Sequence, residues 1–277
     1  MIQLRGSTTL LTGASRGIGA VLAPALAAEG TNLVLTARDA QKLERVRAQC
    51  AAFHVDVRIV AADVSVAADR ERLDREAGPV DILINNAAIQ MTRAVVDQTS
   101  RDVESQLVTD LIAPIELTRM VLPGMLERRR GAIVNISSMS GKAATPYNAI
   151  YAAAKHGLNG FTVSLHHELY GSGVHAGVVC PSFVASTGMW ADTGQRAPAM
   201  MREVKPEKVV RAVFDVLGGA GEVLVTPGPM RPLLALRELF PSIEGRILRR
   251  AGILDALRGR AATASTPESQ HPTPKKN

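Results

Sequence analysis

The stretch TGASRGIG, Thr12 to Gly19, joins two apolar segments near the start of the chain. Before it lies TTLL (8–11), which is typical of a strand, and after it lies AVLA (20–23), which suits a helix. Its glycines, at positions 13, 17 and 19, permit a tight turn with positive φ. The stretch therefore predicts a strand, a glycine-rich turn and a helix that begins near residue 17.

The alternation of strand and helix continues along the chain to residue 227. Short runs rich in β-branched residues predict strands near 7–12, 31–36, 56–61, 80–84, 131–136, 174–180 and 222–226. Helical patterns lie near 17–29, 39–49, 66–76, 101–128, 150–170 and 206–217. Because strands such as AIVNI and NLVLTA are apolar on both faces, the sequence predicts an α/β fold, a doubly wound parallel sheet of about seven strands with helices on both faces.

The glycine-rich turn occupies the place where such sheets usually bind phosphate. Gly13, Gly17 and Gly19 would let the backbone approach a pyrophosphate, and the N–H groups that open the next helix would face it. The spacing is G-x-x-x-G-x-G and not the commoner G-x-G-x-x-G, so a tight turn without a ligand remains an alternative for this motif alone.

Two arginines indicate which dinucleotide would bind. Arg16 lies within the turn, and Arg38 follows the second predicted strand in TARD (36–39). A carboxylate at this strand end would bind a ribose 2′-hydroxyl, whereas arginine suits a 2′-phosphate. Arg16 and Arg38 therefore favour NADP(H) over NAD(H), the alternative being that both are solvated surface residues.

The stretch YAAAK, Tyr151 to Lys155, supplies candidate acid/base chemistry. Tyr151 and Lys155 are four residues apart and share one face of the predicted helix. A neighbouring cation lowers a tyrosine pKa from about 10, which suits general acid/base catalysis near neutral pH. Such a pair alone is usually incidental, but Ser138 lies at the end of a predicted strand, 13 residues before Tyr151.

With these motifs in this order, the sequence resembles the short-chain dehydrogenase/reductase family from about residue 7 to 226. TGASRGIG resembles the family's cofactor loop, and Ser138 with YAAAK resembles its catalytic residues. Three further motifs are similar to those that follow its strands: DVS (63–65), NNAA (85–88) and VVCPS (178–182).

The resemblance implies a Rossmann-like, NAD(P)-dependent enzyme that interconverts an alcohol and a carbonyl. Tyr151 would transfer the proton, Lys155 would lower its pKa and hold the nicotinamide ribose, and Ser138 would orient the substrate oxygen. The family also implies a homodimer or homotetramer built on the helices near 101–128 and 150–170. The implied cofactor-binding residues are Gly13, Ser15, Arg16, Gly17, Ile18, Gly19, Arg38, Asp63, Val64, Asn86, Ala87, Ala88, Tyr151, Lys155, Pro181, Ser182 and Val184.

Three positions depart from the family's usual residues. Ala88 and Ser182 replace glycines, and Asp110 replaces the asparagine that holds a water beside the catalytic lysine. We count Asp110 among the catalytic candidates, because its charge would pair with Lys155 and raise the Tyr151 pKa. This hypothesis predicts a more alkaline activity optimum, whereas the alternative is that Asp110 only accepts a hydrogen bond from the same water.

In this family the substrate is contacted mainly by the loop after the fourth strand, the segment between Ser138 and Tyr151, and the lid after the sixth strand. These segments contain an apolar, adaptable set of side chains: Met91, Met139, Met189, Trp190, Met200 and Met201. We therefore expect a small lipophilic alcohol or ketone, such as a steroid-like, terpenoid or acyl-chain compound. Ordinary packing of the lid on the core is the alternative.

Composition and charge limit the remaining function classes. Of the 277 residues, 46% are hydrophobic and 21% charged, as in globular proteins. There is no basic stripe with interleaved aromatics, so nucleic acid is not an expected partner. The two isolated cysteines have no metal-ligand spacing, so no metal is expected. Because no apolar run reaches the roughly 18 residues of a membrane span and no signal peptide is evident, the expected location is cytoplasmic.

We expect three regions: an NADP-binding and catalytic domain (1–227), an amphipathic helical extension (228–260) and a disordered tail (261–277). Most of the net charge of +6 lies after residue 227, where nine Lys or Arg face four Asp or Glu. Apolar residues recur there at helical spacing, namely Ile243, Ile247, Leu254 and Leu257. This helix would cover the substrate cleft or another subunit, or alternatively make a peripheral contact with an anionic membrane.

The leading hypothesis is an NADP(H)-dependent oxidoreductase. The alternative is a non-catalytic dinucleotide-binding sensor or scaffold of the same fold, since a fold does not by itself define a function. The presence of Ser138, Tyr151 and Lys155 together favours the enzyme.

Overall fold

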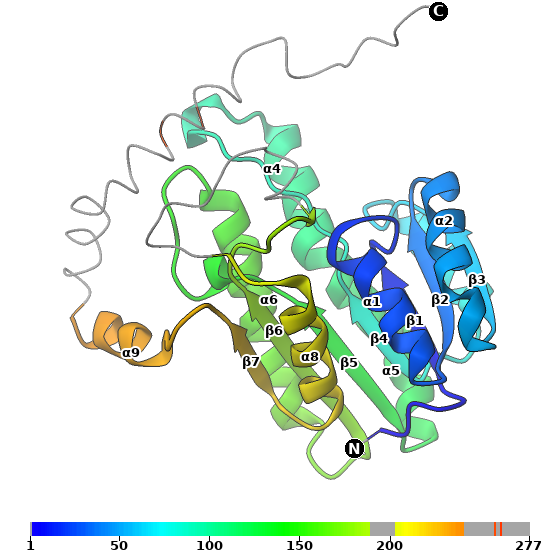
Figure 1. The fold of residues 1–277 in the computed structure, drawn as a ribbon. Helices are drawn as coiled ribbons and strands as arrows, with labels where there is room; N and C mark the ends of the chain where they lie inside the picture. Colours follow the sequence, from blue (N-terminus) through cyan, green and yellow to red (C-terminus); the bar gives the residue numbers. More distant parts are fainter. Residues whose placement is uncertain (1, 189–202, 241–257, 259–260, 262–277) are drawn as a thin grey trace, which may run out of the picture.

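The computed structural model describes residues 2–188, 203–240, 258 and 261. Its centre is a parallel sheet in the order β3-β2-β1-β4-β5-β6-β7 (Figure 1). The strands are β1 (Thr8–Thr12), β2 (Asn32–Ala37), β3 (Val57–Ala61), β4 (Ile82–Asn85), β5 (Gly131–Ile136), β6 (Val174–Pro181) and β7 (Glu222–Val225). The expected doubly wound sheet is thus confirmed, and no predicted strand end is misplaced by more than two residues.

Helices cover both faces of this sheet (Figure 1). One face carries α1 (Gly17–Ala28), α2 (Ala40–Cys50) and α8 (Pro206–Leu217). The other carries α3 (Ala67–Ala77), α4 (Ser100–Leu107), α5 (Ala113–Glu127) and α6 (Ala149–Glu168). Short 3₁₀ turns occupy η1 (Ala51–Phe53), η2 (Val95–Asp97) and η4 (Met139–Gly141).

The strands contribute to a separate hydrophobic core on each face. Leu11 and Leu35 pack with α1 and α2, whereas Leu10, Val34 and Leu83 pack with the helices opposite. Successive residues of a strand point to opposite faces, so a strand with a core on both sides must be apolar throughout. Each fully buried leucine contributes about 1.5–3 kcal/mol to stability.

The single helix expected over 101–128 is interrupted, and in this respect the prediction is wrong. Between α4 and α5 lies η3 (Val108–Ile112), a π-helical turn. A π turn adds one residue to the helix and occurs frequently at functional sites. The apolar periodicity of the sequence does not reveal such an insertion, because the helix continues on either side. Asp110 lies in this turn.

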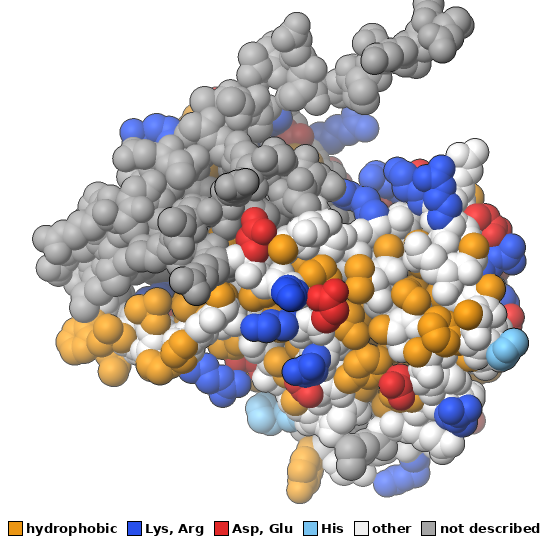
Figure 2. Space-filling model, in the orientation of Figure 1, with side chains coloured by type: hydrophobic (Ala, Val, Ile, Leu, Met, Phe, Trp, Pro, Cys, Tyr) orange, Lys and Arg blue, Asp and Glu red, His pale blue; other side chains and the backbone are white. Residues whose placement is uncertain are grey.

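Part of the expected C-terminal extension forms α9 (Arg231–Leu239). Hydrophobic side chains gather over this helix in Figure 2, and Leu239 and Phe240 are exposed. The expected lid methionines 189, 200 and 201, Trp190, the amphipathic pattern from 243 to 257, and all of the expected tail except Ala261 lie outside the described residues. Among the helices that the structure does describe, none has both the length and the apolar character needed to cross a membrane.

Candidate active site

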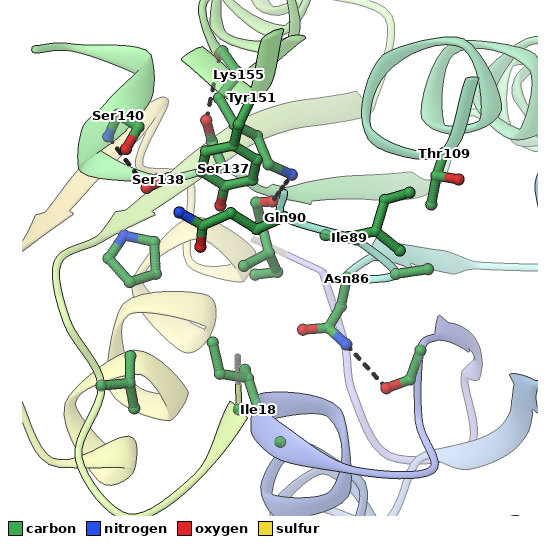
Figure 3. Close-up of a pocket in the computed structure, with 18 of the residues that line it drawn as sticks. Ile18, Asn86, Ile89, Gln90, Thr109, Ser137, Ser138, Ser140, Tyr151 and Lys155 are labelled. Carbon is green, nitrogen blue, oxygen red and sulfur yellow. Dashed lines mark hydrogen bonds between the residues drawn. The ribbon is translucent and has the colours of Figure 1, made fainter. Parts of the chain in front are cut away.

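A cavity of about 880 Å³ opens at the carboxyl ends of the strands, where the strand order reverses between β1 and β4 (Figure 3). This is the position at which doubly wound sheets bind their ligands. All of the expected cofactor residues except Gly19 line it, as does Ser138. Asp110 does not line it, and lies buried.

The glycine loop is shaped by close backbone packing. Gly13 and Gly17 have φ values of +65° and +61°, which side chains rarely adopt. A Cβ at Gly13 would lie 2.8 Å from the Cα of Ala87, and one at Gly19 would lie 2.3 Å from the Gly13 carbonyl oxygen. Gly19 is therefore required for the packing of the loop and is not a lining residue.

Asn86 joins this loop to the end of β4 (Figure 3). Its Nδ2 donates to the carbonyl oxygens of Thr12 (3.0 Å) and Gly13 (3.1 Å). In return, the Thr12 hydroxyl oxygen accepts hydrogen bonds from the backbone N–H groups of Asn86 (2.9 Å) and Ala87 (3.0 Å). Asn86 thus fixes the two strand ends that flank the crevice.

A cluster of charged residues follows β2 and β3. The Arg38 side chain is 75% exposed, with its Nη1 3.9 Å from Asp63 Oδ2. Asp63 Oδ1 accepts hydrogen bonds from the backbone N–H and the hydroxyl of Ser65. Lys42, in the first turn of α2, also lines the cavity and was not identified from the sequence.

Three of the four catalytic candidates, Ser138, Tyr151 and Lys155, line the opposite part of the cavity (Figure 3). Tyr151 and Lys155 lie one turn apart on α6, with Lys155 Nζ 5.6 Å from the centre of the tyrosine ring. Lys155 Nζ donates to the Ile136 carbonyl oxygen at 3.3 Å, which anchors it to the end of β5. Ser138 Oγ accepts a hydrogen bond from the Ser140 N–H at 3.0 Å, and Ser138 lies close enough to Tyr151 to lower the pKa of its hydroxyl.

Burial shifts the pKa values of Tyr151 and Lys155. Removal from water raises the pKa of Tyr151, as does the charge of Asp110, while the Ser138 hydrogen bond opposes both. Burial also lowers the pKa of Lys155, and Asp110 opposes this shift. Asp110 therefore influences the pKa values of both Tyr151 and Lys155.

Asp110 lies wholly buried beneath the site. Its Oδ1 accepts a hydrogen bond from the Ile89 N–H at 2.8 Å, and its Oδ2 has no partner among the described residues. Burial raises the pKa of Asp110 to about 6, whereas Lys155 and the Ile89 N–H lower it. Asp110 therefore changes charge within the physiological range of pH.

Several further lining residues lie on the substrate side. Gln90, Asn148 and Thr109 supply polar groups, and Met230 comes from the segment before α9. Gln90 belongs to the loop that the sequence assigned to the substrate, but the position of Met230 had no local signal. Among the described residues, no group of three His, Cys, Asp or Glu side chains could hold a metal ion.

The chain is similar to known dehydrogenases and reductases in sequence and in fold. A family model described as short chain dehydrogenase matches residues 7–198. The ketoacyl reductase HetN of Nostoc sp. is 37% identical over 94% of each chain, and the D-beta-hydroxybutyrate dehydrogenase of Cupriavidus necator is 37% identical over 66% of this chain and 72% of its own. A solved short-chain dehydrogenase from Sphingobium yanoikuyae, in complex with NADPH, superposes with a TM-score of 0.74 at 30% identity, covering 87% of this chain and 95% of that one.

Proposed function

Because the chain belongs to the short-chain dehydrogenase/reductase family of NAD(P)-dependent oxidoreductases, we propose that it uses NADP(H) to interconvert an apolar alcohol and its ketone. One observation carries this proposal: Ser138, Tyr151 and Lys155 lie in the same cavity as the glycine loop. A non-catalytic sensor has no need of a buried tyrosine–lysine pair that lines the same cavity as a serine.

The cavity fits a nicotinamide dinucleotide. Gly13 lines the cavity, and α1 begins at Gly17 without a side-chain cap, so its first N–H groups remain for an anion such as a pyrophosphate. At the far end, the buried Ser182 hydroxyl lines the cavity and has no partner among the described residues. We assign Ser182 and Pro181 to the carboxamide side of the ring.

The charged cluster after β2 is the basis for choosing NADP(H). Arg38 and Lys42 place two cations at the strand end where a ribose 2′-phosphate would lie. Arg16, at the start of α1, lines the same part of the cavity. A 2′-hydroxyl would need a carboxylate acceptor there, and the nearby Asp39 is already within 3.1 Å of Lys42.

Side chains of the protein transfer the proton. When bound, the cofactor supplies or accepts the hydride. In reduction, Ser138 Oγ holds the substrate oxygen while the Tyr151 hydroxyl donates its proton to it; in oxidation, Tyr151 takes the proton back. The Lys155 cation, whose Nζ lies 5.6 Å from the centre of the Tyr151 ring, favours the phenolate over the neutral hydroxyl.

Two further assignments follow from family membership. The described apolar lining, Met91, Met139, Phe183 and Met230, supports a lipophilic, acyl-chain or ring substrate. A homodimer or homotetramer built on α4, α5 and α6 would cover the exposed Ile112 and Val163. We assign residues 1–227 to the catalytic domain.

Cofactor titration tests the proposal first. NADPH is expected to bind more tightly than NADH, and Arg38→Asp is expected to weaken NADPH binding about tenfold or more, because a charge-assisted contact becomes repulsive. Arg45→Asp, on the exposed face of α2, is the matched control and leaves affinity unchanged. Calorimetric titration measures the dissociation constants of NADPH and NADH from the wild type and from the two variants.

A second measurement separates binding from turnover. Tyr151→Phe is expected to bind NADPH normally but to reduce lipophilic ketones at least about a hundredfold more slowly, because the proton donor is removed. Preference for NADH would contradict the assignment of Arg38. A wild-type protein that binds neither dinucleotide, or that binds NADPH but turns over no carbonyl in a broad screen, would favour the scaffold alternative.

A further inference from the structure

The side chain of Asn159 links α6 to the turn that carries Ser138. Tyr151, Lys155 and Asn159 follow one another at intervals of four residues, so each lies one helical turn from the next on the same side of α6. Asn159 is buried and does not line the cavity. Its Nδ2 donates to the carbonyl oxygen of Gly141 at 2.7 Å. This bond joins α6 to the last residue of η4, the turn that Ser138 precedes.

The same contact explains the glycine at position 141. A Cβ there would lie 2.6 Å from Asn159 Nδ2 and 2.7 Å from the Lys155 carbonyl oxygen, distances that a Cβ does not tolerate. The Lys155 carbonyl also accepts a hydrogen bond from the Ser137 hydroxyl at 3.3 Å. The chain is therefore held against α6 immediately before Ser138 and again three residues after it.

Within the turn, hydrogen bonds lead from this anchor to the Ser138 side chain. The Gly141 N–H donates to the Ser138 carbonyl oxygen at 2.9 Å. The Ser140 N–H donates to the Ser138 hydroxyl oxygen at 3.0 Å (Figure 3). The backbone of the turn therefore directs the Ser138 hydroxyl, and the bond from Asn159 holds that backbone in place.

The Gly141 carbonyl depends on the amide of Asn159. Because a carbonyl can only accept, the group of Asn159 that faces it must be the NH₂, and Oδ1 faces the Cys180 thiol, a weak donor, at 3.7 Å. Gly141 is buried, and a buried carbonyl without a donor is costly. Without the amide, the turn is expected to move away from α6 towards water, taking Ser138 with it while Tyr151 stays on the helix.

We propose that Asn159 is a positioning residue that holds the turn of Ser138 against α6, so that Ser138 Oγ and the Tyr151 hydroxyl reach the same substrate oxygen. This inference rests on the proposed function and adds a residue that touches neither substrate nor cofactor. Asn159 acts through Ser138, so its replacement affects the reaction only while the Ser138 hydroxyl is present.

A double-mutant cycle tests this dependence in the full-length protein, with NADPH and a lipophilic ketone that the wild type reduces. Asn159→Leu keeps the side-chain size but removes the amide. It is expected to lower kcat/KM for the ketone about tenfold, because the Ser138 hydroxyl is misplaced, and to change the dissociation constant of NADPH by less than about twofold. In the Ser138→Ala background the same substitution is expected to change kcat/KM by less than about twofold, because the hydroxyl that Asn159 positions is already absent.

Thr162→Val is the matched control. Thr162 is a buried polar residue of the same helix, and its hydroxyl accepts from Asn135 Nδ2 at 2.8 Å instead of bonding the turn. Its effect on kcat/KM is expected to be the same with and without the Ser138 hydroxyl, as for two independent sites. If Asn159→Leu does not fold, Asn159→Ala takes its place in the cycle, because it leaves space for a water to bond the Gly141 carbonyl.

Hydrogen exchange measured by mass spectrometry tests the anchor without any reaction. In Asn159→Leu the N–H groups of residues 139–143 are expected to exchange about tenfold faster, while those of α1 are unchanged. An equal loss of activity with and without the Ser138 hydroxyl, weaker NADPH binding, or unchanged exchange would overturn the role of Asn159 while carbonyl reduction stands. If the wild type reduces no ketone, or Ser138→Ala has no measurable rate, exchange alone decides: faster exchange confined to the turn supports the anchor, and unchanged exchange overturns it.

Discussion

At the scale of single residues, the site depends on three buried ionisable groups that influence one another. Burial raises the pKa of Tyr151 and lowers that of Lys155, so each is displaced away from its charged form. Asp110 has its own pKa raised to about 6 and acts on both neighbours. The proton of Tyr151 is therefore controlled by a carboxylate that does not line the cavity.

The pH profile of alcohol oxidation tests this control. Above pH 6 Asp110 is ionised and raises the pKa of Tyr151, so the phenolate that accepts the substrate proton forms only at higher pH. Asp110→Asn removes the charge and is expected to move the alkaline rise of kcat/KM to lower pH by about one unit. Glu116→Gln, on the neighbouring α5, is the control. An unmoved profile would show that Asp110 acts only through hydrogen bonding.

At the scale of elements, the α4–η3–α5 run combines a rigid start with an irregular centre. Thr99 and Asp102 form a capping box: the Thr99 hydroxyl accepts from the Asp102 N–H at 3.1 Å, and the Asp102 carboxylate accepts from the Thr99 N–H at 3.0 Å. Asp102 also pairs with Arg93 at 3.1 Å. The cap fixes the helix from which Gln106 and Asp110 hold Ile89.

Removing this cap has a predictable cost. Thr99→Ala is expected to lower the free energy of unfolding by about 1 kcal/mol, because a helix-terminal N–H loses its acceptor. Ser100→Ala, at the next and equally exposed position, is expected to change it by less than about 0.5 kcal/mol. Equilibrium denaturation with urea measures both, and equal effects of the two substitutions would contradict the assignment.

At the scale of the whole molecule, the candidate active site lies at one edge of the parallel sheet, and a pair of histidines lies near the other. Its carboxyl edge collects Gly13, Asn86, Ser138 and Pro181 from four strands. Near the start of β6, His175 and His166 pack edge to face and bond backbone carbonyls of Ala220 (3.2 Å) and Ala176 (2.9 Å). Burial, the largest cause, lowers the pKa of His175.

Stability is therefore expected to depend on His175 at mildly acid pH. Since its pKa is lower in the folded than in the unfolded protein, the folded state binds fewer protons, and stability falls as the pH drops below about 6.5. The free energy of unfolding of wild type relative to His175→Gln is expected to decrease between pH 7 and pH 5. The exposed His167→Gln is the control, and a constant difference across this range would refute the idea.

Local patterns in the sequence determined the sheet, the glycine turn and the Tyr151–Lys155 pair. They did so because strand and helix periods, glycine spacing and an i, i+4 pair are properties of neighbouring residues. The resemblance to the family, and not these patterns, placed Gln90 in the substrate loop and marked Asp110 as unusual. The π turn at Asp110 escaped them, since one inserted residue leaves the apolar pattern on both sides intact.

Only the tertiary structure decided what those residues can do. Asn159 bonds the carbonyl of Gly141, 18 residues earlier, in the turn that follows Ser138. The raised pKa of Asp110 follows from complete burial, which outweighs the lowering effect of Lys155. Hydrogen-bond partners and desolvation depend on groups that are distant in the chain and adjacent only in the folded protein, so they could not be read from local sequence.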